Sequence, residues 1–314
     1  MMDKKKTPVL LVGCGNIGGA LLKLWSSFDI FSEIVVVQPS LASAEDFACY
    51  NSIKFVNDVK NIRSIAKPTM LEDFLGVYGT QDRSVLDVRE DPSTGTTTKR
   101  PNRGRLRDDF VPDVVVLAIK PQMAETVIPS LRPYIGEALV ISALAGTALD
   151  KLAALTAKDS RIVRIMPTVA IKTGRSVNLA FANKNVDVTG IEMVKKIIGL
   201  SGEITWVQEE NHLDILTPIS GSGPAYFFLL AEILVEETVK LGIDEDTARH
   251  IIQGTLVGSA SLVSDNVDFA ALRESVTSKK GVTEAALEIM SSGMRNVMEK
   301  SLKAAMQRLE ELKK

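Results

Sequence analysis

The chain has few of the residues on which several common kinds of functional site depend. Its 314 residues include two cysteines, two histidines and 5% aromatic residues. The two cysteines, Cys14 and Cys49, cannot form a disulfide framework and do not stand as a C-x-x-C pair, which favours a reducing cytoplasm. Two histidines without clustered acids or cysteines argue against a metal site and against a Ser-His-Asp triad. We therefore expect no bound metal.

Strong net charge and long apolar runs are also lacking. The 37 basic and 39 acidic residues leave a formal net charge of -2, which is not typical of a protein that binds polyanions. The densest apolar stretch, residues 224–235, contains Glu232 and is shorter than a membrane-spanning helix. The first predicted strand, residues 9–12, begins too early to leave room for a signal or transit peptide. These features predict a cytoplasmic protein with neither a membrane nor a nucleic acid as partner.

The glycine-rich stretch near the start of the chain is the first strong functional signal. Residues 8–20 read PVLLVGCGNIGGA, so an apolar strand leads into a G-x-G-x-x-G loop and an amphipathic helix. A second apolar strand follows at 33–37, at the spacing of a βαβ unit. This context favours a Rossmann-type dinucleotide-binding fold over a plain glycine-rich turn. The cofactor phosphates should meet the loop and the free amides of the helix start. The predicted contacts are Gly13, Gly15, Asn16, Ile17 and Gly18.

The end of the second strand bears on the choice of cofactor. It reads Gln38-Pro39-Ser40, with no acidic residue to bind the ribose hydroxyls of NAD and with a hydroxyl available for a 2′-phosphate. The sequence therefore favours NADPH, with NADH possible. The alternative is that this turn only caps the helix that follows it.

The rest of the first two thirds of the chain predicts further elements of the same sheet. Strands are expected at residues 53–56, 114–119, 138–142, 161–167, 176–182 and 204–207, and a helix at 188–200. Ligands of open α/β sheets bind at the carboxyl ends of strands, although Lys120-Pro121 could simply end its strand. The cofactor contacts predicted at these ends are Gln38, Ser40, Asn57, Ala118, Ile119, Lys120, Pro121, Ala143, Leu144 and Ala145. Residues 60–110 lack periodicity, and we interpret them as a solvated, largely mobile surface insertion rather than an anion site.

Beyond residue 207 the strand signals stop and helices follow. They are predicted at 224–241, 245–264, 269–276, 284–290 and 295–312, with Asp244, Asp268 and Thr283 as N-caps. The predicted fold class is thus α/β, with a doubly wound Rossmann-type sheet (1–208) before an all-helical domain for dimerisation and substrate binding (209–314). The helix at 224–241 is apolar nearly all round and must be buried. Because the few other helices cannot cover it, we predict that it forms a subunit interface.

Two other stretches could carry chemistry. Residues 220–226 read SGSGPAY, which does not match the G-x-S-x-G elbow of hydrolases. Residues 276–283 read VTSKKGVT and lead into a helix, so hydroxyls, a glycine and free amides meet at a helix start. That combination suits a carboxylate ligand, and an ordinary capped helix is an equal alternative.

Taken together, these stretches resemble the pyrroline-5-carboxylate reductase family, which performs the last step of proline biosynthesis. The resemblance covers most of the chain outside the insertion, and the run at 220–226 is its most specific motif. The other matching segments are the glycine loop, residues 118–121, residues 141–146, Arg164 with Met166-Pro167, and residues 276–283. The resemblance implies a Rossmann domain that binds NADPH or NADH and a helical domain that forms dimers, which often assemble further.

The resemblance also implies an activity and the residues that perform it. Hydride passes from the nicotinamide to the imine carbon of 1-pyrroline-5-carboxylate and gives proline, which agrees with the absence of a histidine base. Thr283 matches the family threonine that contacts the ring nitrogen, and it is the expected catalytic residue. The implied substrate-binding residues are Ser278, Gly281, Val282 and Thr283, and they include a cradle for the carboxylate.

Two departures from the family pattern leave other functions open. The chain reads MPTVA at 166–170 where the family has Met-Pro-Asn followed by a proline, and SKKGVT at 278–283 where the family has Ser-Pro-Gly-Gly-Thr-Thr. Lys279 or Lys280 could add positive charge to carboxylate binding. The alternative functions are a catalytically impaired cofactor-binding relative that acts as a regulatory module, and a reductase of another cyclic imine.

Overall fold

The computed structural model describes residues 6–38, 52–56, 58 and 110–313. The chain divides into two compact units, Met1–Glu210 and Asn211–Lys314. The predictions made for Ser40, Asn57 and almost the whole insertion at 60–110 fall outside the described residues.

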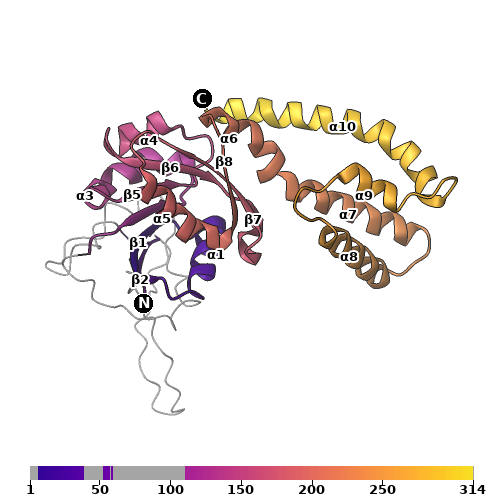
Figure 1. The fold of residues 1–314 in the computed structure, drawn as a ribbon, viewed down its shortest axis with the longest axis horizontal. Coiled ribbons are helices and arrows are strands. Elements are labelled where there is room, and N and C mark those ends of the chain that lie inside the picture. Colours follow the sequence, from indigo (N-terminus) through magenta and orange to yellow (C-terminus); the bar gives the residue numbers. More distant parts are fainter. Residues whose placement is uncertain (1–5, 39–51, 57, 59–109, 314) are drawn as a thin grey trace, which may run out of the picture. The chain divides into compact units, whose positions relative to one another are not determined.

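The first unit is built on an eight-stranded sheet with the strand order β3-β2-β1-β4-β5-β6-β7-β8 (Figure 1). The strands are β1 (Thr7–Val12), β2 (Phe31–Val37), β3 (Ile53–Val56), β4 (Val114–Leu117), β5 (Leu139–Ser142), β6 (Arg161–Met166), β7 (Ser176–Ala182) and β8 (Gly202–Trp206). Every strand predicted from the sequence is present. The prediction for β4 was too long, because the chain bends at Ile119 beside the glycine loop.

Neighbouring strands of this sheet are parallel except β6 and β7, which are antiparallel. Residues 167–175 connect these two strands. Parallel neighbours need a crossover of about a dozen residues or more, so this connection is too short for one. The predicted doubly wound sheet is confirmed, and its orientation reverses once near one edge.

Helices cover both faces of the sheet. On one face, Val9 and Leu11 of β1 pack in a cluster with α1 (Asn16–Trp25) and α5 (Val188–Ile198). On the other face, Leu10 and Val12 pack with a second group of short helices. That group consists of α2 (Ala124–Val127), η5 (Ile128–Leu131), α3 (Arg132–Ile135) and α4 (Leu149–Leu155), with η4 (Pro121–Met123) before it. Strands covered on both faces are apolar at nearly every position, which explains the near-continuous apolar runs.

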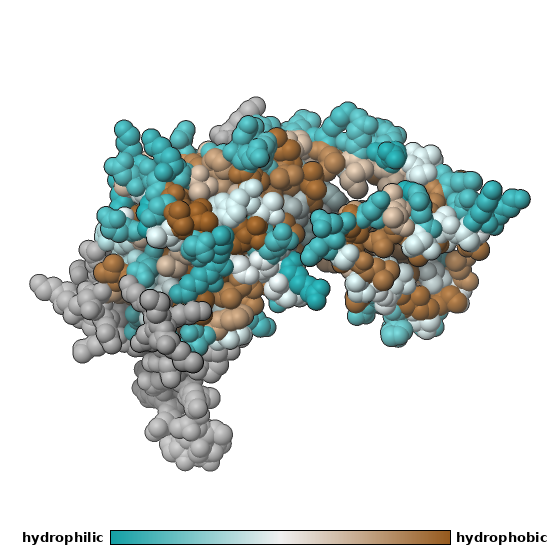
Figure 2. Space-filling model, in the orientation of Figure 1, coloured by the Kyte–Doolittle hydropathy of each residue, from teal (hydrophilic) through white to brown (hydrophobic). Residues whose placement is uncertain are grey.

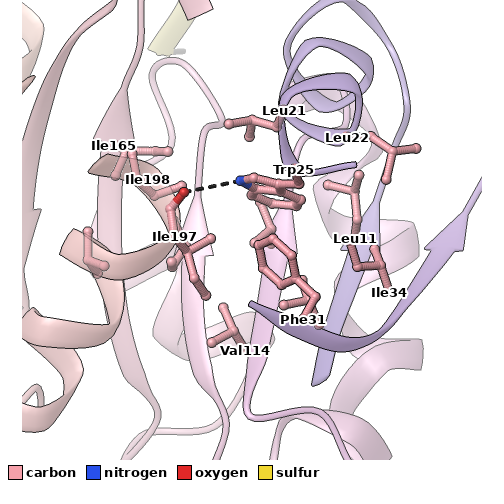
Figure 3. Packing of buried hydrophobic residues seen from close by; sticks show 14 of the residues in the cluster. Leu11, Leu21, Leu22, Trp25, Phe31, Ile34, Val114, Ile165, Ile197 and Ile198 are labelled. Carbon is pink, nitrogen blue, oxygen red and sulfur yellow. Dashed lines mark hydrogen bonds between the residues drawn. The ribbon is translucent and has the colours of Figure 1, made fainter. Parts of the chain in front are cut away.

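Trp25, at the end of α1, joins two of the covering helices. Its side chain is fully buried, and its indole Nε1 donates a hydrogen bond to the Ile197 carbonyl of α5 at 3.1 Å (Figure 3). The Phe31 ring at the start of β2 lies 5.4 Å away, centroid to centroid, in a tilted arrangement. A buried indole N–H needs such a hydrogen-bond acceptor. Trp25 therefore holds α1 against α5 by a directional hydrogen bond as well as by the apolar surface that it buries.

The second unit is helical throughout its described elements. They are α6 (Glu210–Leu216), which begins with the last residue of the first unit, the π-helix η8 (Thr217–Gly221), α7 (Gly223–Lys240), α8 (Glu245–Ser261), α9 (Phe269–Ser275) and α10 (Val282–Lys313). The Asp244 carboxylate accepts a hydrogen bond from the Thr247 amide, and Asp268 accepts from Ala270 and Ala271. Both predicted N-caps are confirmed.

Two predictions about α10 were wrong. The helices expected at 284–290 and 295–312 are one continuous helix, because Ser291 and Ser292 donate to the carbonyls of Glu288 and Ile289 and do not break it. The helix also begins at Val282, so Thr283 lies inside its first turn and is not the N-cap.

The second unit buries very little of its apolar surface within one chain. Its buried residues, among those described, are Leu213, Pro218, Gly223, Ala248 and Leu309. Large apolar side chains of α7 remain exposed, and hydrophobic surface is visible on these helices in Figure 2. They are Phe227, Phe228, Leu229, Leu230, Ile233 and Leu234. A helix that is apolar all round is stable in water only when something covers it.

The apolar helix is longer than its sequence predicted. Helix α6, the π-helix and α7 form one helical run, Glu210–Lys240, whose length and composition alone would suffice to cross a membrane. The prediction of a stretch too short for a bilayer was therefore wrong about its length. A mostly buried core helix of a soluble protein meets the same criterion, whereas only 11% of the most apolar part of this run is buried within the chain.

Replacement of Trp25 by phenylalanine tests the link between α1 and α5. The change removes a buried hydrogen bond and leaves a small void, so we expect the free energy of unfolding to fall by about 2 kcal/mol. Urea unfolding followed by circular dichroism at one protein concentration measures this. Phe28→Leu is the control, because Phe28 is 41% exposed near the same helix end and should change stability by less than about 0.5 kcal/mol. If the two variants lowered the free energy of unfolding equally, Trp25 would not be the residue that links α1 to α5.

Candidate functional site

The strand order reverses between β1 and β4, which lie side by side at the middle of the sheet. The segments after these strands are tied to the ladder, because the Gly13 amide donates to Val37 and the Ala118 amide donates to Val12, at 2.9 and 2.8 Å. In open α/β sheets the ligand crevice forms at the carboxyl ends of strands at such a reversal. The predicted glycine loop and the predicted segment 118–121 therefore meet at the expected edge.

Two glycines of the loop are required by close backbone packing. Gly13 has φ +93°, and a Cβ on it would lie 2.7 Å from the Ala118 carbonyl oxygen. A Cβ on Gly18 would lie 2.0 Å from the carbonyl oxygen of Gly13, so α1 approaches the strand end too closely for any side chain. Gly13 and Gly18 are therefore required for the packing of the loop and α1.

The middle glycine is different, because nothing lies within 4 Å of where a Cβ on Gly15 would stand. Gly15 is the N-cap residue of α1, no side chain caps this helix, and its first turn has no acidic residue. The first amides of a helix lack partners inside the helix and carry partial positive charge, which suits phosphate. An open, uncapped helix start beside a glycine loop fits the pyrophosphate of a dinucleotide.

Gln38 connects the end of β2 to the glycine loop. Its side-chain oxygen accepts a hydrogen bond from the Cys14 amide at 2.9 Å, and its own amide donates to Val56 of β3 at 2.9 Å. Cys14 is buried, and this burial raises the pKa of its thiol, so the thiol stays protonated near neutral pH. Gln38 is thus fixed against the glycine loop, and its contact with the cofactor stays a prediction. Cys14 is no reactive nucleophile.

The segments after β4 and β5 contribute mainly backbone and small side chains. Ala118 and Ala143 are half-buried, and the Ala143 amide donates to Leu117 at 2.9 Å. Leu144 is only 2% exposed and packs in the second core cluster, so it offers a ligand little besides its backbone. The remaining predicted contacts here, Ile119, Lys120, Pro121 and Ala145, follow the same strand ends.

Thr168 accounts for one of the departures from the family pattern. It is the N-cap of η6 (Val169–Thr173), and its hydroxyl accepts a hydrogen bond from the Ala170 amide at 3.3 Å. Its own amide donates to the Ser176 hydroxyl at 2.9 Å. Asparagine and threonine both cap helices with a side-chain oxygen, so threonine here preserves the local turn.

In the second unit, the predicted substrate residues form a tight turn before α10. The Gly281 amide donates to the Ser278 carbonyl at 2.9 Å, and Lys280 has φ +58°, as the third residue of a type II turn has. A Cβ on Gly281 would lie 2.2 Å from the Ser278 hydroxyl. The Lys280 amide is held by the Glu284 carboxylate at 2.5 Å. The family pattern has proline and glycine at the second and third positions of this turn. In this chain Lys279 and Lys280 form the same kind of turn.

Thr283 follows this turn in the first turn of α10. It is half-buried, and its hydroxyl makes no hydrogen bond within the described part of the chain. Val282 is 91% exposed. Thr283 thus presents an uncommitted hydroxyl next to the free amides of a long helix, and its contact with the substrate nitrogen stays a prediction.

The π-helix η8, which includes the first two residues of the SGSGPAY motif, could not be predicted from the sequence. The Tyr226 hydroxyl donates to the Pro218 carbonyl at 2.7 Å, and the Ser220 hydroxyl donates to Leu216 at 3.1 Å. A π-turn leaves carbonyls without their usual partners, and these hydroxyls satisfy two of them. Pro218, which lacks an amide hydrogen, was the one local sign of an interrupted helix.

No group of three or more histidine, cysteine, aspartate or glutamate side chains gathers among the described residues in a way that could hold a metal ion.

Comparisons with known proteins agree with this arrangement. The family model for pyrroline-5-carboxylate reductase dimerisation matches residues 210–312. The pyrroline-5-carboxylate reductase of Haemophilus influenzae is 37% identical over 204 residues, which cover 64% of this chain and 75% of that relative. The enzyme of Pseudomonas aeruginosa is 36% identical over 203 residues, covering 64% of this chain and 74% of the relative. The chain belongs to the pyrroline-5-carboxylate reductase family.

Solved structures extend the likeness to the whole chain. A pyrroline-5-carboxylate reductase from Coxiella burnetii matches with a TM-score of 0.76 and 27% identity, covering 99% of this chain and 100% of that one. The Plasmodium falciparum reductase, solved with NADP bound, has the same fold with a TM-score of 0.73 and 21% identity, over 99% of both chains. The predicted family, fold class and oxidoreductase activity are confirmed, as is a nicotinamide dinucleotide as the cofactor of the family.

The different surroundings of Gly15 and Gly18 give a sharp test of the cofactor cradle. Gly15→Ala places a methyl group in open space, so the free energy of unfolding should change by less than about 0.5 kcal/mol. The same methyl group narrows the approach to the backbone, so we expect the Kd for NADPH to rise at least about tenfold. Fluorescence titration of the cofactor and thermal unfolding measure the two effects.

Gly18→Ala is the contrasting variant. Its methyl group meets the Gly13 carbonyl, so this variant should lose about 2 kcal/mol of stability or fail to fold. If Gly15→Ala bound NADPH as tightly as the parent protein, the cofactor would not lie against this loop.

Proposed function

We propose that this chain reduces 1-pyrroline-5-carboxylate to L-proline with NADPH, as the final step of proline biosynthesis. The observation that carries the proposal is the open, uncapped start of α1 at Gly15 in a chain of this family. It is supported by the uncommitted hydroxyl of Thr283 beside the Ser278 turn. The reductases to which the chain is similar carry this activity in their names.

The glycine loop would hold the cofactor by its backbone. The amides of Asn16, Ile17 and Gly18, at the start of α1, would bind the pyrophosphate, and the backbone at 143–145, which follows β5, would face the nicotinamide end. Gln38 is amide rather than acid, so it does not repel a 2′-phosphate, which favours NADPH while leaving NADH possible. When bound, the nicotinamide supplies a hydride.

The turn at 278–283 would hold the substrate. The backbone amides at the start of α10 and the Ser278 hydroxyl suit the carboxylate, and Thr283 donates its hydroxyl to the ring nitrogen. The imine carbon gains the hydride and the nitrogen gains a proton, so one C=N double bond becomes a single bond. Because the ring imine is already partly protonated near neutral pH, a positioned hydroxyl suffices and no histidine is needed. Fixing the two reactants supplies several kcal/mol of the barrier reduction.

The exposed apolar face of α7 supports a second copy of this chain as the partner. The second unit has few buried residues of its own, and the family match over 210–312 is to a dimerisation domain. Burial of α7 against its counterpart would give the dimer, and dimers could assemble further. With a small molecule as substrate and no basic excess in the composition, we propose neither nucleic acid nor membrane as a partner and the cytoplasm as the location.

The proposed reaction is tested by following NADPH oxidation by the purified protein with and without 1-pyrroline-5-carboxylate, with proline identified as the product. Thr283→Val should lower kcat/KM by about a hundredfold while Thr283→Ser retains most of it, since only the valine lacks a hydroxyl. NADPH binding without turnover by the parent protein would instead support the impaired relative, and turnover of another cyclic imine alone would support the altered substrate. Equal rates for the valine and serine variants would exclude Thr283 from catalysis.

The left-handed conformation of Lys280 leads to a separate prediction. Lys280→Gly should stabilise the protein by about 1 kcal/mol, because glycine adopts a positive φ without strain. If the lysines attract the substrate carboxylate, Lys279→Ala combined with Lys280→Gly should also raise the KM for the substrate about fivefold, with kcat nearly unchanged.

Asn266→Gly is the matched control, because Asn266 has φ +57° and lies outside the turn. Asn266→Gly should also relieve strain and raise the free energy of unfolding, but it should leave the KM for the substrate unchanged. An unchanged KM in the double lysine variant would show that these lysines do not bind the substrate.

A further inference from the structure

An ion pair between a buried arginine and a half-buried glutamate lies one strand away from the segment predicted to face the nicotinamide. Arg164 of β6 is 3% exposed, and its guanidinium Nη1 donates to the Glu210 carboxylate oxygen Oε1 at 2.5 Å. Glu210 is the first residue of α6 and the last of the first unit. Since Arg164 is almost wholly removed from water, its charge needs such a partner, and the carboxylate is in turn held in one orientation.

The same carboxylate oxygen caps another helix. It accepts a hydrogen bond from the Leu149 amide, the first residue of α4, at 2.7 Å. The N-cap residue of α4 is Ala148, whose side chain cannot supply a capping oxygen. Glu210, distant in sequence, therefore provides the cap that the local sequence lacks.

These contacts hold the far end of the segment 143–148. The segment leaves β5 after Ser142, which stands in register opposite Arg164. Its near end is tied to the sheet, because the Ala143 amide donates to the Leu117 carbonyl at 2.9 Å. Its far end reaches Leu149, which is tied to Glu210. The segment thus spans two fixed points, with a positive φ of +66° at Gly146 between them.

We propose that Arg164 and Glu210 are positioning residues for the reduction, because together they fix the segment 143–148 against which the nicotinamide ring rests. The inference rests on the proposed function, in particular on the role of Ala143, Leu144 and Ala145 at the cofactor. Neither side chain touches a reacting atom. Arg164 orients the carboxylate, the carboxylate anchors the start of α4, and the anchored segment would keep the nicotinamide ring in one orientation for hydride transfer.

The first test uses the protein without cofactor. In Glu210→Ala the Leu149 amide loses its acceptor, so its hydrogen exchange should become at least about tenfold faster, together with that of residues 144–148. Glu210→Gln keeps an acceptor oxygen without the charge and should show a smaller increase. Unchanged exchange at Leu149 in Glu210→Ala would overturn the proposal, because the segment would then be held by something else.

The second test is kinetic and uses the holoenzyme. Per folded enzyme, we expect kcat to fall about tenfold in Glu210→Gln and up to about a hundredfold in Glu210→Ala, since misplacement by a fraction of an ångström to an ångström costs rates of this order. The KM for pyrroline-5-carboxylate should stay within about twofold, because the substrate turn is untouched. Arg164→Lys keeps the positive charge and should retain more of kcat than Arg164→Met.

Glu125→Gln is the matched control. Glu125, in α2, forms an exposed ion pair with Lys151 of α4, the helix that Glu210 caps. It should leave both kcat and hydrogen exchange as in the parent protein. Faster exchange in Glu210→Ala with an unchanged kcat would also overturn the positioning role. A uniform loss of folded protein, with normal activity in what remains, would show that the pair acts only on stability.

Failure of the proposed function gives a different result. In that case the parent protein would not turn over pyrroline-5-carboxylate at all. The fluorescence of bound NADPH would then replace kcat as the readout, and it should change in Glu210→Ala and not in Glu125→Gln. Identical spectra of bound cofactor in the parent and Glu210→Ala would overturn the proposal in that case too.

Discussion

The contact of three backbone segments at Gly13, Gly18 and Ala118 is the constraint on which the first unit depends. Helix α1 begins directly over the end of β1, so closely that a side-chain carbon on Gly18 would lie 2.0 Å from the Gly13 carbonyl oxygen. This approach brings the uncapped amides of α1 to the reversal of strand order between β1 and β4. The close packing of α1 on the end of β1 therefore also places the free amides of α1 where an anion can bind. Nothing lies within 4 Å of a Cβ on Gly15, so the packing does not require glycine there, and its contact with the cofactor is our proposal.

The two units differ in how they obtain a hydrophobic core. The first unit covers both faces of its sheet within one chain, and residues such as Trp25 and Leu11 are fully buried there. The second unit buries few apolar residues and exposes those of α7. A helical unit with so little burial gains little to offset its conformational entropy, which supports the proposed association of this unit with a second copy. This agrees with a family domain defined by dimerisation.

The two departures from the family pattern have different structural meanings. Thr168 replaces one capping side chain with another, and its hydroxyl keeps the turn after β6. Lys280 instead retains a conformation that glycine would adopt without strain. A residue held at positive φ costs stability, and such positions gather at functional sites. The first substitution is neutral for the local geometry, whereas the second keeps the geometry and adds charge to the turn.

The sequence by itself determined the sheet, the glycine loop and most of the helices, because these follow from local patterns. Continuous apolar runs mark strands covered on both faces, and the carboxylates of Asp244 and Asp268 cap helices from the adjacent position. The sequence-based prediction failed at residues 291–293, where two serines and a glycine, which are weak helix formers, nevertheless continue a helix.

Only the tertiary structure decided that Glu210 caps α4, that the Tyr226 hydroxyl completes a π-turn and that β7 runs antiparallel to β6. The Glu210 contact joins atoms far apart in the chain, the π-turn shifts a helical ladder by one residue, and the direction of β7 depends on how its connection packs. No periodicity of the sequence encodes such contacts, because they arise only after the strands and helices have come together.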